Sequence, residues 1–198
     1  MILLLGVAVT FAAREPPDYR QILVDRAIAR FHHVKMERGI ETALDFGDSF
    51  AQQVIGSARL YYEFGLACNQ ENLTIKAMGY YNKAIKNQPD MVEALYDRAE
   101  LFIVDEKLDE AKEDLHKAST AKHWAVHFRL AEIAAREKNL QDFENQLTES
   151  IRYGFSLENL LNLGQHWRFW AKDPTLGRIL RRVILLYGSE EIWLELSQ

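Results

Sequence analysis

The sequence predicts an all-α fold: a solenoid of stacked antiparallel helix pairs with atypical capping helices at both ends. In the 198-residue chain, residues 58–91 and 92–123 repeat one pattern of small and large side chains with a 34-residue offset. A fixed period of this length is typical of repeats that each contain one helix pair. β-branched residues do not cluster in alternating runs, so no sheet is expected. The 10 glycines and 4 prolines are spread along the chain, so no linker divides it.

The repeated pattern places small residues where two helices must approach each other closely and large residues between them. The matched positions are Tyr61 and Leu95, Gly65 and Ala99, Cys68 and Phe102, Ala77 and Ala111, Tyr81 and Leu115, and Ala84 and Ala118. Small and large side chains at helical spacing let antiparallel helices interdigitate. Pro89 ends the first pair, because proline disfavours helix at the preceding residue. Cys68, the single cysteine, lies in a core slot and is expected to be a buried, inert thiol.

These positions resemble the tetratricopeptide-repeat family. The first copy matches nearly every slot of the family pattern, with Cys68 in place of an aromatic residue, and the second has His123 in place of the last proline. A third, degenerate copy spans 124–155 and has Phe143 where a small residue is expected. It keeps Leu130, Ala131, Ala134, Leu147 and Ser150. The resemblance covers about residues 58–155 and implies a superhelix whose concave face binds peptides or protein surfaces.

Both flanks of the array are predicted to be helical caps. Residues 18–57 form a degenerate helix pair in which Gly39 separates two amphipathic patterns, as expected for the terminal unit of an array. Residues 156–198 are predicted to form C-terminal capping helices. Ser156 is a candidate N-cap for the first of them, and Pro174 is expected at the first position of a later helix.

Residues 1–17 form an apolar N-terminal segment with two possible roles. Its apolar run, 1–13, is too short to span a bilayer as a helix. It suits the hydrophobic region of a secretory signal, or an uncleaved segment that packs on the stack, on a partner or on a membrane surface. A basic region before the run is missing, since Arg14 follows it. This favours the uncleaved segment, and an intracellular over a secreted or periplasmic location.

Composition and motifs argue against several function classes. The net charge of −5 disfavours general nucleic-acid binding, which requires a basic face. His123 and His127 have the spacing of two metal ligands on one helix face, but no third ligand accompanies them. No phosphate-binding glycine loop or nucleophile motif occurs. We therefore expect no enzyme activity, no cofactor and no metal site.

The family resemblance implies that the first helix of each pair lines the concave face, and two columns of residues are predicted there. The aromatic column is Tyr62, Tyr96 and Phe128, and the column four residues further on is Leu66, Glu100 and Glu132. Aromatic side chains are good binding anchors, and carboxylates favour a ligand with Lys or Arg. The alternative is that the aromatic slot only packs neighbouring helices.

Chaperone-binding members of the family hold an acidic tail with Lys and Asn on these helices. The matching positions here include Tyr62, Leu66 and Asp97, and only Arg129 would suit a carboxylate. We therefore expect no binding of an acidic chaperone tail.

A secondary surface is predicted on the C-terminal cap. Aromatic and basic residues lie close together there: Trp167, Trp170, Arg178, Arg181 and Arg182. They suit docking to an acidic partner, or alternatively a cap core whose charges face water.

The main functional hypothesis is a non-catalytic adaptor, scaffold or assembly factor. Its partner is a protein or peptide, basic or apolar in character, bound in an aromatic and acidic groove. The alternative is a structural subunit of a larger complex that uses its outer faces and termini, with the groove filled by a neighbour or by the N-terminal segment.

Overall fold

The computed structural model describes residues 19–53 and 57–198. Regular secondary structure in these residues consists of eleven α-helices and two short 3₁₀ helices, and the prediction of an all-α fold of antiparallel helix pairs is confirmed. The hypotheses about residues 1–17 lie outside the described part. The chain divides into two compact units, Met1–Ile55 and Gly56–Gln198. Among the described helices, none has both the length and the apolar character needed to cross a membrane.

The N-terminal unit contains the helix pair α1 (Tyr19–Arg38) and α2 (Ile40–Gln53). Gly39 joins the two helices with φ +84°, a left-handed conformation that glycine adopts without steric cost. Its N–H donates to the carbonyl of Lys35 and so completes the end of α1. The buried residues of α1 recur every three or four positions: Val24, Ala27, Phe31 and Val34. The helices form where the sequence predicts them, and their role as a cap stays a prediction.

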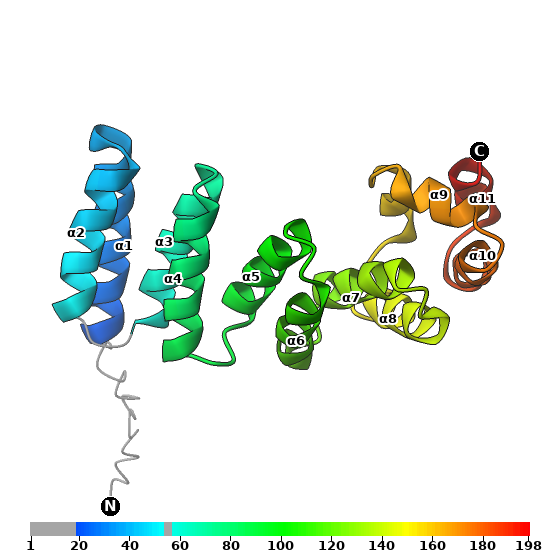
Figure 1. Cartoon of the computed structure of the whole chain (residues 1–198), viewed down its shortest axis with the longest axis horizontal. Helices are drawn as coiled ribbons and strands as arrows, with labels where there is room; N and C mark the ends of the chain where they lie inside the picture. The colour runs from blue at the N-terminus through cyan, green and yellow to red at the C-terminus, as the bar shows by residue number, and fades with distance from the viewer. Residues whose placement is uncertain (1–18, 54–56) are drawn as a thin grey trace, which may run out of the picture. The chain divides into compact units, whose positions relative to one another are not determined.

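The C-terminal unit begins with three helix pairs (Figure 1). They are α3 (Ala58–Gln70) with α4 (Thr74–Asn87), α5 (Val92–Val104) with α6 (Leu108–Ala118), and α7 (Trp124–Arg136) with α8 (Leu140–Arg152). The helices of each pair pack on one another, α4 packs on α5, and α6 packs on α7. A short 3₁₀ helix, η1 (Ser119–Ala121), follows α6.

The same turn closes the first helix of all three pairs. Asn72, Glu106 and Lys138 each have a left-handed backbone, with φ of 58°, 59° and 56°. The backbone N–H of the residue that follows each of them donates a hydrogen bond to a carbonyl in the last turn of the helix. In the first pair, the Leu73 N–H donates to the Cys68 carbonyl at 2.9 Å. This is the Schellman arrangement, which satisfies carbonyls that the helix end leaves free. The backbone therefore repeats through α7 and α8, even though their side-chain pattern is degenerate.

The small residues of the pattern lie at close helix contacts. A Cβ atom on Gly65 would lie 2.6 Å from the ring of Tyr81, so only glycine leaves room for this tyrosine. The alanines of the pattern are fully buried: Ala77, Ala84, Ala99, Ala111 and Ala118. Cys68 is also buried, as expected. Phe143, the large residue in the third copy, is fully buried as well, because its ring packs beside Trp167 and Trp170 of the cap.

The segment predicted to be a C-terminal cap, called the cap from here on, contains η2 (Leu157–Leu161), α9 (His166–Lys172), α10 (Leu176–Tyr187) and α11 (Glu190–Leu196). Its capping role stays a prediction. Two details of its prediction were wrong. Ser156 precedes a 3₁₀ helix, and its side chain makes no capping hydrogen bond. Pro174 precedes α10, and the Asp173 carboxylate accepts from the backbone N–H of Leu176 at 2.9 Å instead. The Thr175 hydroxyl and the backbone N–H groups of Thr175 and Leu176 all donate to this carboxylate, and they hold the pKa of Asp173 below its usual value.

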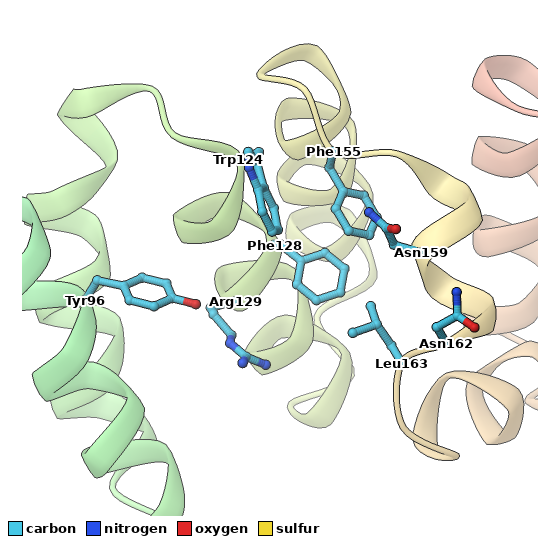
Figure 2. Close-up of a pocket in the computed structure, with 8 residues that line it drawn as sticks. All are labelled: Tyr96, Trp124, Phe128, Arg129, Phe155, Asn159, Asn162 and Leu163. Carbon is cyan, nitrogen blue, oxygen red and sulfur yellow. The ribbon is translucent and has the colours of Figure 1, made fainter. Parts of the chain in front are cut away.

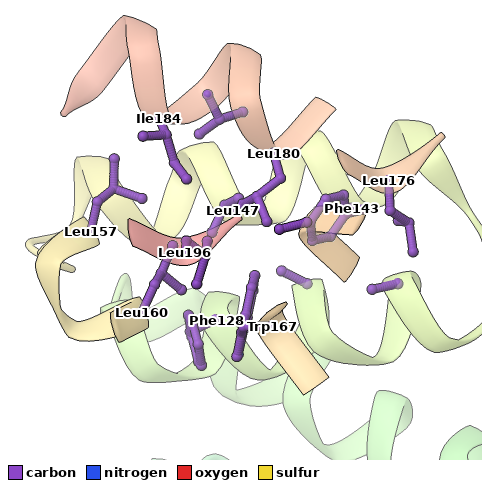
Figure 3. Close-up of a cluster of buried hydrophobic side chains, with 14 of the residues drawn as sticks. Phe128, Phe143, Leu147, Leu157, Leu160, Trp167, Leu176, Leu180, Ile184 and Leu196 are labelled. Atoms are coloured by element: carbon purple, nitrogen blue, oxygen red, sulfur yellow. The ribbon is translucent and has the colours of Figure 1, made fainter. Parts of the chain in front are cut away.

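A single hydrophobic core joins the cap to the last helix pair (Figure 3). Trp167 of α9 is fully buried and stacks on Phe128 of α7, with ring centroids 5.1 Å apart. Leu147 of α8 and Leu180 of α10 lie in the same cluster. The hydrophobic core of the array therefore continues into the cap. Leu157 and Leu160 of η2 belong to the same cluster as Phe128 of α7.

Candidate functional site

Two adjoining hollows lie along the first helices of the three pairs. The acidic hollow, of about 300 Å³, is lined by Tyr62, Val92, Glu93, Tyr96, Asp97, His123, Ala125 and Val126. The aromatic hollow, of about 270 Å³, is lined by Tyr96, Trp124, Phe128, Arg129, Phe155, Asn159, Asn162 and Leu163 (Figure 2). Tyr96 lines both hollows, so they adjoin at this residue, and together their lining comes from α3, α5, α7 and the segment around η2.

The acidic hollow carries negative charge without a lining Lys or Arg. Glu93 is exposed at its edge and Asp97 is half-buried. Burial raises the pKa of Asp97 above its usual value, although the neighbouring hydroxyls of Tyr62 and Tyr81 favour the charged form. His123 uses its Nδ1 to accept the N–H of Ala125 at 3.3 Å. The hollow therefore suits a cationic side chain.

Two tyrosines lie near Asp97: Tyr62 lines the acidic hollow, and Tyr81 is fully buried. Burial raises the pKa of Tyr62 and of Tyr81, and the neighbouring carboxylate of Asp97 raises both further. Both phenols therefore stay neutral. Their rings lie 6.1 Å apart. This arrangement places an aromatic wall and a carboxylate side by side.

Arg129 lines the aromatic hollow, but its charge is used within the protein. Its Nε lies 2.7 Å from Glu100 Oε1, and its Nη1 donates to Glu132. Burial lowers the pKa of Arg129, but the charges of Glu132 and Glu100 outweigh this effect and raise it overall. Burial raises the pKa of Glu100 despite its pairing with Arg129. The guanidinium therefore has little capacity left for an anionic ligand.

Glu132 does not line the groove as the sequence predicted. It is 4% exposed, and its Oε1 accepts from Trp167 Nε1 at 3.2 Å and lies 2.9 Å from His166 Nε2. These partners come from α9, more than thirty positions further along the chain, which is why helical periodicity could not reveal them. The acidic character lies instead at Glu93 and Asp97, which flank Tyr96 on α5. Their positions next to the aromatic slot on the same helix could have indicated from the sequence that they line the site.

The predicted aromatic column divides into two kinds of residue. Tyr62 and Tyr96 are half-buried and line the hollows. Phe128 is only 4% exposed and packs against Phe155, with ring centroids 4.4 Å apart. It forms the inner wall of the aromatic hollow and mainly serves the core. Leu66 is half-buried and lines neither hollow.

Three lining residues of the aromatic hollow were missed because they follow the predicted array. Asn159 lies in η2, and Asn162 and Leu163 lie just beyond it. Trp124 begins α7 and was not assigned to the groove. The fold brings them together because the chain returns past α7 after Phe155.

The secondary surface predicted on the cap loses its largest member. Trp167 is fully buried in the core, whereas Trp170 is half-buried. The three arginines of this surface are exposed: Arg178, Arg181 and Arg182. Arg182 forms an ion pair with Glu144. Phe169, which the prediction omitted, is 69% exposed.

In the described residues, no group of three or more His, Cys, Asp or Glu side chains could hold a metal ion. His123 caps α7, and His127 Nδ1 lies 2.9 Å from the Gln146 carboxamide oxygen. Both histidines of the predicted pair therefore have structural partners.

Comparison with known proteins finds similar structures. No protein-family model matches this chain, and no curated protein matches it. Its structure is similar to the crystal structure of MamA, with 14% identity, 68% of this chain and 84% of that chain covered, and a TM-score of 0.57. It is also similar to MamA 41-end from Desulfovibrio magneticus RS-1, with 15% identity, coverage of 83% and 94%, and a TM-score of 0.61.

This chain has a tetratricopeptide-repeat fold. A third similar structure is the human IFIT1 dimer with PPP-AAAA, with 16% identity, 88% of this chain and 46% of that chain covered, and a TM-score of 0.56. In the tetratricopeptide-repeat fold, helix pairs usually serve protein–protein interaction. At these identities the similarity establishes the fold alone.

Asp97 offers a test of the site's electrostatics. Because its folded-state pKa is raised above the ordinary value of 3.8, ionisation disfavours the folded state, and stability falls as pH rises through the folded pKa. We expect Asp97→Asn to equal or exceed the wild type in thermal stability at neutral pH. The difference should shrink as the pH falls through the folded pKa and vanish below 3.8, where Asp97 is neutral in both the folded and the unfolded state.

The matched control is Asp90→Asn, at an exposed turn position, where we expect a change within about 0.5 kcal/mol. Thermal unfolding of the three proteins across this pH range gives the comparison. A clear loss of stability in Asp97→Asn at neutral pH would mean that the fold requires the charge.

Proposed function

We propose that this chain is a non-catalytic interaction module, an adaptor, scaffold or assembly factor, that binds a peptide or protein segment in the two hollows. The observation that carries the proposal is that the two hollows adjoin at Tyr96 and are lined by aromatic and acidic side chains. Aromatic anchors bury much area at small entropic cost, and they often supply most of the binding energy of an interface.

The charge of the acidic hollow supports a ligand segment with a Lys or Arg. Glu93 and Asp97 attract a cation, and Tyr62 provides an aromatic face beside them. An acidic tail would meet these carboxylates and would find Arg129 already engaged by Glu100 and Glu132. The same argument disfavours a phosphate-bearing ligand such as the PPP-AAAA of the IFIT1 structure, because phosphate contacts require free cationic groups.

The test is selection of binders from a random peptide library on the wild-type protein. We expect the selected peptides to be rich in Lys or Arg and to lose about tenfold or more in affinity for Tyr96→Ala, since this residue serves both hollows. The matched control is Tyr187→Ala, because Tyr187 is 49% exposed and lies outside both hollows. Thermal unfolding checks that both variants fold. Equal binding to Tyr96→Ala and the wild type would contradict the proposal.

The alternative, a structural subunit of a larger complex, is favoured by exposed apolar residues on the cap. Phe169 and Leu186 are each 69% exposed, and Leu194 is 55% exposed. Large apolar groups of this kind often mark interaction surfaces. Size-exclusion chromatography separates the two functions: a monodisperse monomer is expected for an adaptor, and self-association in isolation for a subunit that lacks its neighbours.

A further inference from the structure

The aromatic hollow has the features of a binding site in its own right. Its walls come from three places: Tyr96 of α5, the face of α7, and the segment from Phe155 to Leu163 (Figure 2). Its volume of about 270 Å³ is below the roughly 300–1,000 Å³ of pockets that enclose drug-sized molecules. It therefore suits one large side chain of a longer ligand.

The lining of the aromatic hollow is mainly apolar and leaves hydrophobic surface in water. Trp124 and Leu163 are each 37% exposed, although both are large and lie beside buried rings. Burying such surface against a ligand side chain is favourable, since each square ångström of apolar area removed from water contributes about 25 cal/mol. A bound apolar side chain would complete the cover over these two residues.

The charge balance of the aromatic hollow excludes an anionic side chain. Its one lining cation, Arg129, is paired with Glu100 and Glu132. A carboxylate or phosphate placed there would need to break these contacts and would leave a carboxylate unpaired, which is costly in a partly buried site. The hollow therefore favours a neutral side chain.

Two asparagines on the edge of the hollow suit the backbone of an extended segment. Asn159 and Asn162 are exposed, and across the described residues neither carboxamide is bonded to another group of the protein. A carboxamide both donates and accepts, so it can pair with the N–H and C=O of a peptide unit. Their position on the edge would hold the backbone while a side chain enters the hollow.

We infer that the aromatic hollow is a subsite for one large neutral apolar side chain, and that the ligand is an extended peptide segment that carries such a residue near a basic one. The inference rests on the proposed function and names the partner's chemistry. The basic residue would lie in the acidic hollow, which adjoins the aromatic one through Tyr96. Stacking of His123 on Trp124, with ring centroids 5.7 Å apart, also links the two hollows.

The probes are short capped peptides on a glycine–serine background that carry a Lys pair and one Trp at varied separation, in both orders. Matched sets replace the Trp with Ala or the Lys pair with a Glu pair. Binding is followed by the fluorescence anisotropy of a labelled peptide. At the best separation we expect Trp removal and Lys-to-Glu replacement each to weaken binding by about tenfold or more.

The protein variants test each hollow with a matched control. Leu163→Asp places a charge in the aromatic hollow, and its control Leu186→Asp makes the same change at a position 69% exposed on α10. Glu93→Lys reverses charge in the acidic hollow, and its control Glu195→Lys lies on the exposed part of α11. We expect about tenfold loss for each hollow variant and none for the controls. Asn162→Ala changes no buried group, and we expect it to weaken peptide binding several-fold. It tests the aromatic hollow if Leu163→Asp unfolds the protein.

The outcomes separate the inference from the proposed function. Loss with Glu93→Lys but not with Leu163→Asp and Asn162→Ala would overturn the apolar subsite and leave the groove function standing. Unchanged binding in all hollow variants, or no binding of any peptide, would overturn both. Tight binding of an oligoadenylate that Leu163→Asp abolishes would show that the hollow stacks a nucleobase, and would overturn the peptide assignment.

Discussion

Replacing Glu132 with Ala should lower the free energy of unfolding by about 3 kcal/mol, because it breaks a buried ion pair and hydrogen-bond network. The carboxylate is 4% exposed and serves Arg129 of its own helix together with His166 and Trp167 of α9. Without it, the Trp167 Nε1–H is buried with no acceptor, and Arg129 keeps only Glu100. Urea denaturation followed by circular dichroism measures the change.

The control for Glu132→Ala is Glu144→Ala, which breaks a surface ion pair with Arg182. Glu144 bonds Arg182, whose side chain is 62% exposed, so Glu144→Ala should cost less than about 1 kcal/mol. Glu132→Gln should fall between the two, since the amide oxygen still accepts from Trp167 but the charge that balances Arg129 is lost. If Glu132→Ala costs no more than Glu144→Ala, the network does not stabilise the junction between α7 and the cap.

Replacing Trp167 with Ala should cost about 3–5 kcal/mol, the range for removal of a large aromatic side chain from a core. The ring is fully buried, stacks on Phe128 at 5.1 Å and meets Trp170 edge-on at 4.9 Å. Because this cluster joins α7 and α8 to the cap, the variant should loosen α9, α10 and α11 first. Hydrogen exchange measured helix by helix would show this loss of protection in the cap.

Phe169 provides the matched control, two positions further along α9. It is 69% exposed, so Phe169→Ala should change stability by no more than about 0.5 kcal/mol. Glu132→Ala and Trp167→Ala should also be less than additive together, because they remove two ends of one hydrogen bond. Equal costs for Trp167→Ala and Phe169→Ala would contradict the assignment of Trp167 to the core.

Much of the fold was predictable from the sequence because the repeat encodes it locally. Gly65 faces Tyr81 at a distance that no Cβ would allow, and the offset pattern places alanine at the equivalent close contacts. The helix pair around Gly39 and the burial of Cys68 followed from the same kind of spacing. Helical periodicity states which face of a helix a residue occupies, so it predicts packing within a pair and between neighbouring pairs.

The candidate site was predicted less well, because its properties depend on segments that meet only after folding. Periodicity placed Glu132 on the right helix but could not show that His166 and Trp167 would cover it. It marked Arg129 as a cation but not as one that two carboxylates neutralise. Residues after Phe155 were assigned to a cap, yet they complete the aromatic hollow.

The repeat in the sequence thus specifies the helix pairs, their close contacts and the helices that line the two hollows, since these depend on residues a few turns apart. Whether a side chain on that face is free for a ligand depends on what packs against it from elsewhere in the chain. For Glu132 and Phe128 the cap packs there and buries them. For Glu93, Asp97, Trp124 and Leu163 nothing in the described part of the C-terminal unit covers the hollows that they line, and these are the residues on which binding should depend.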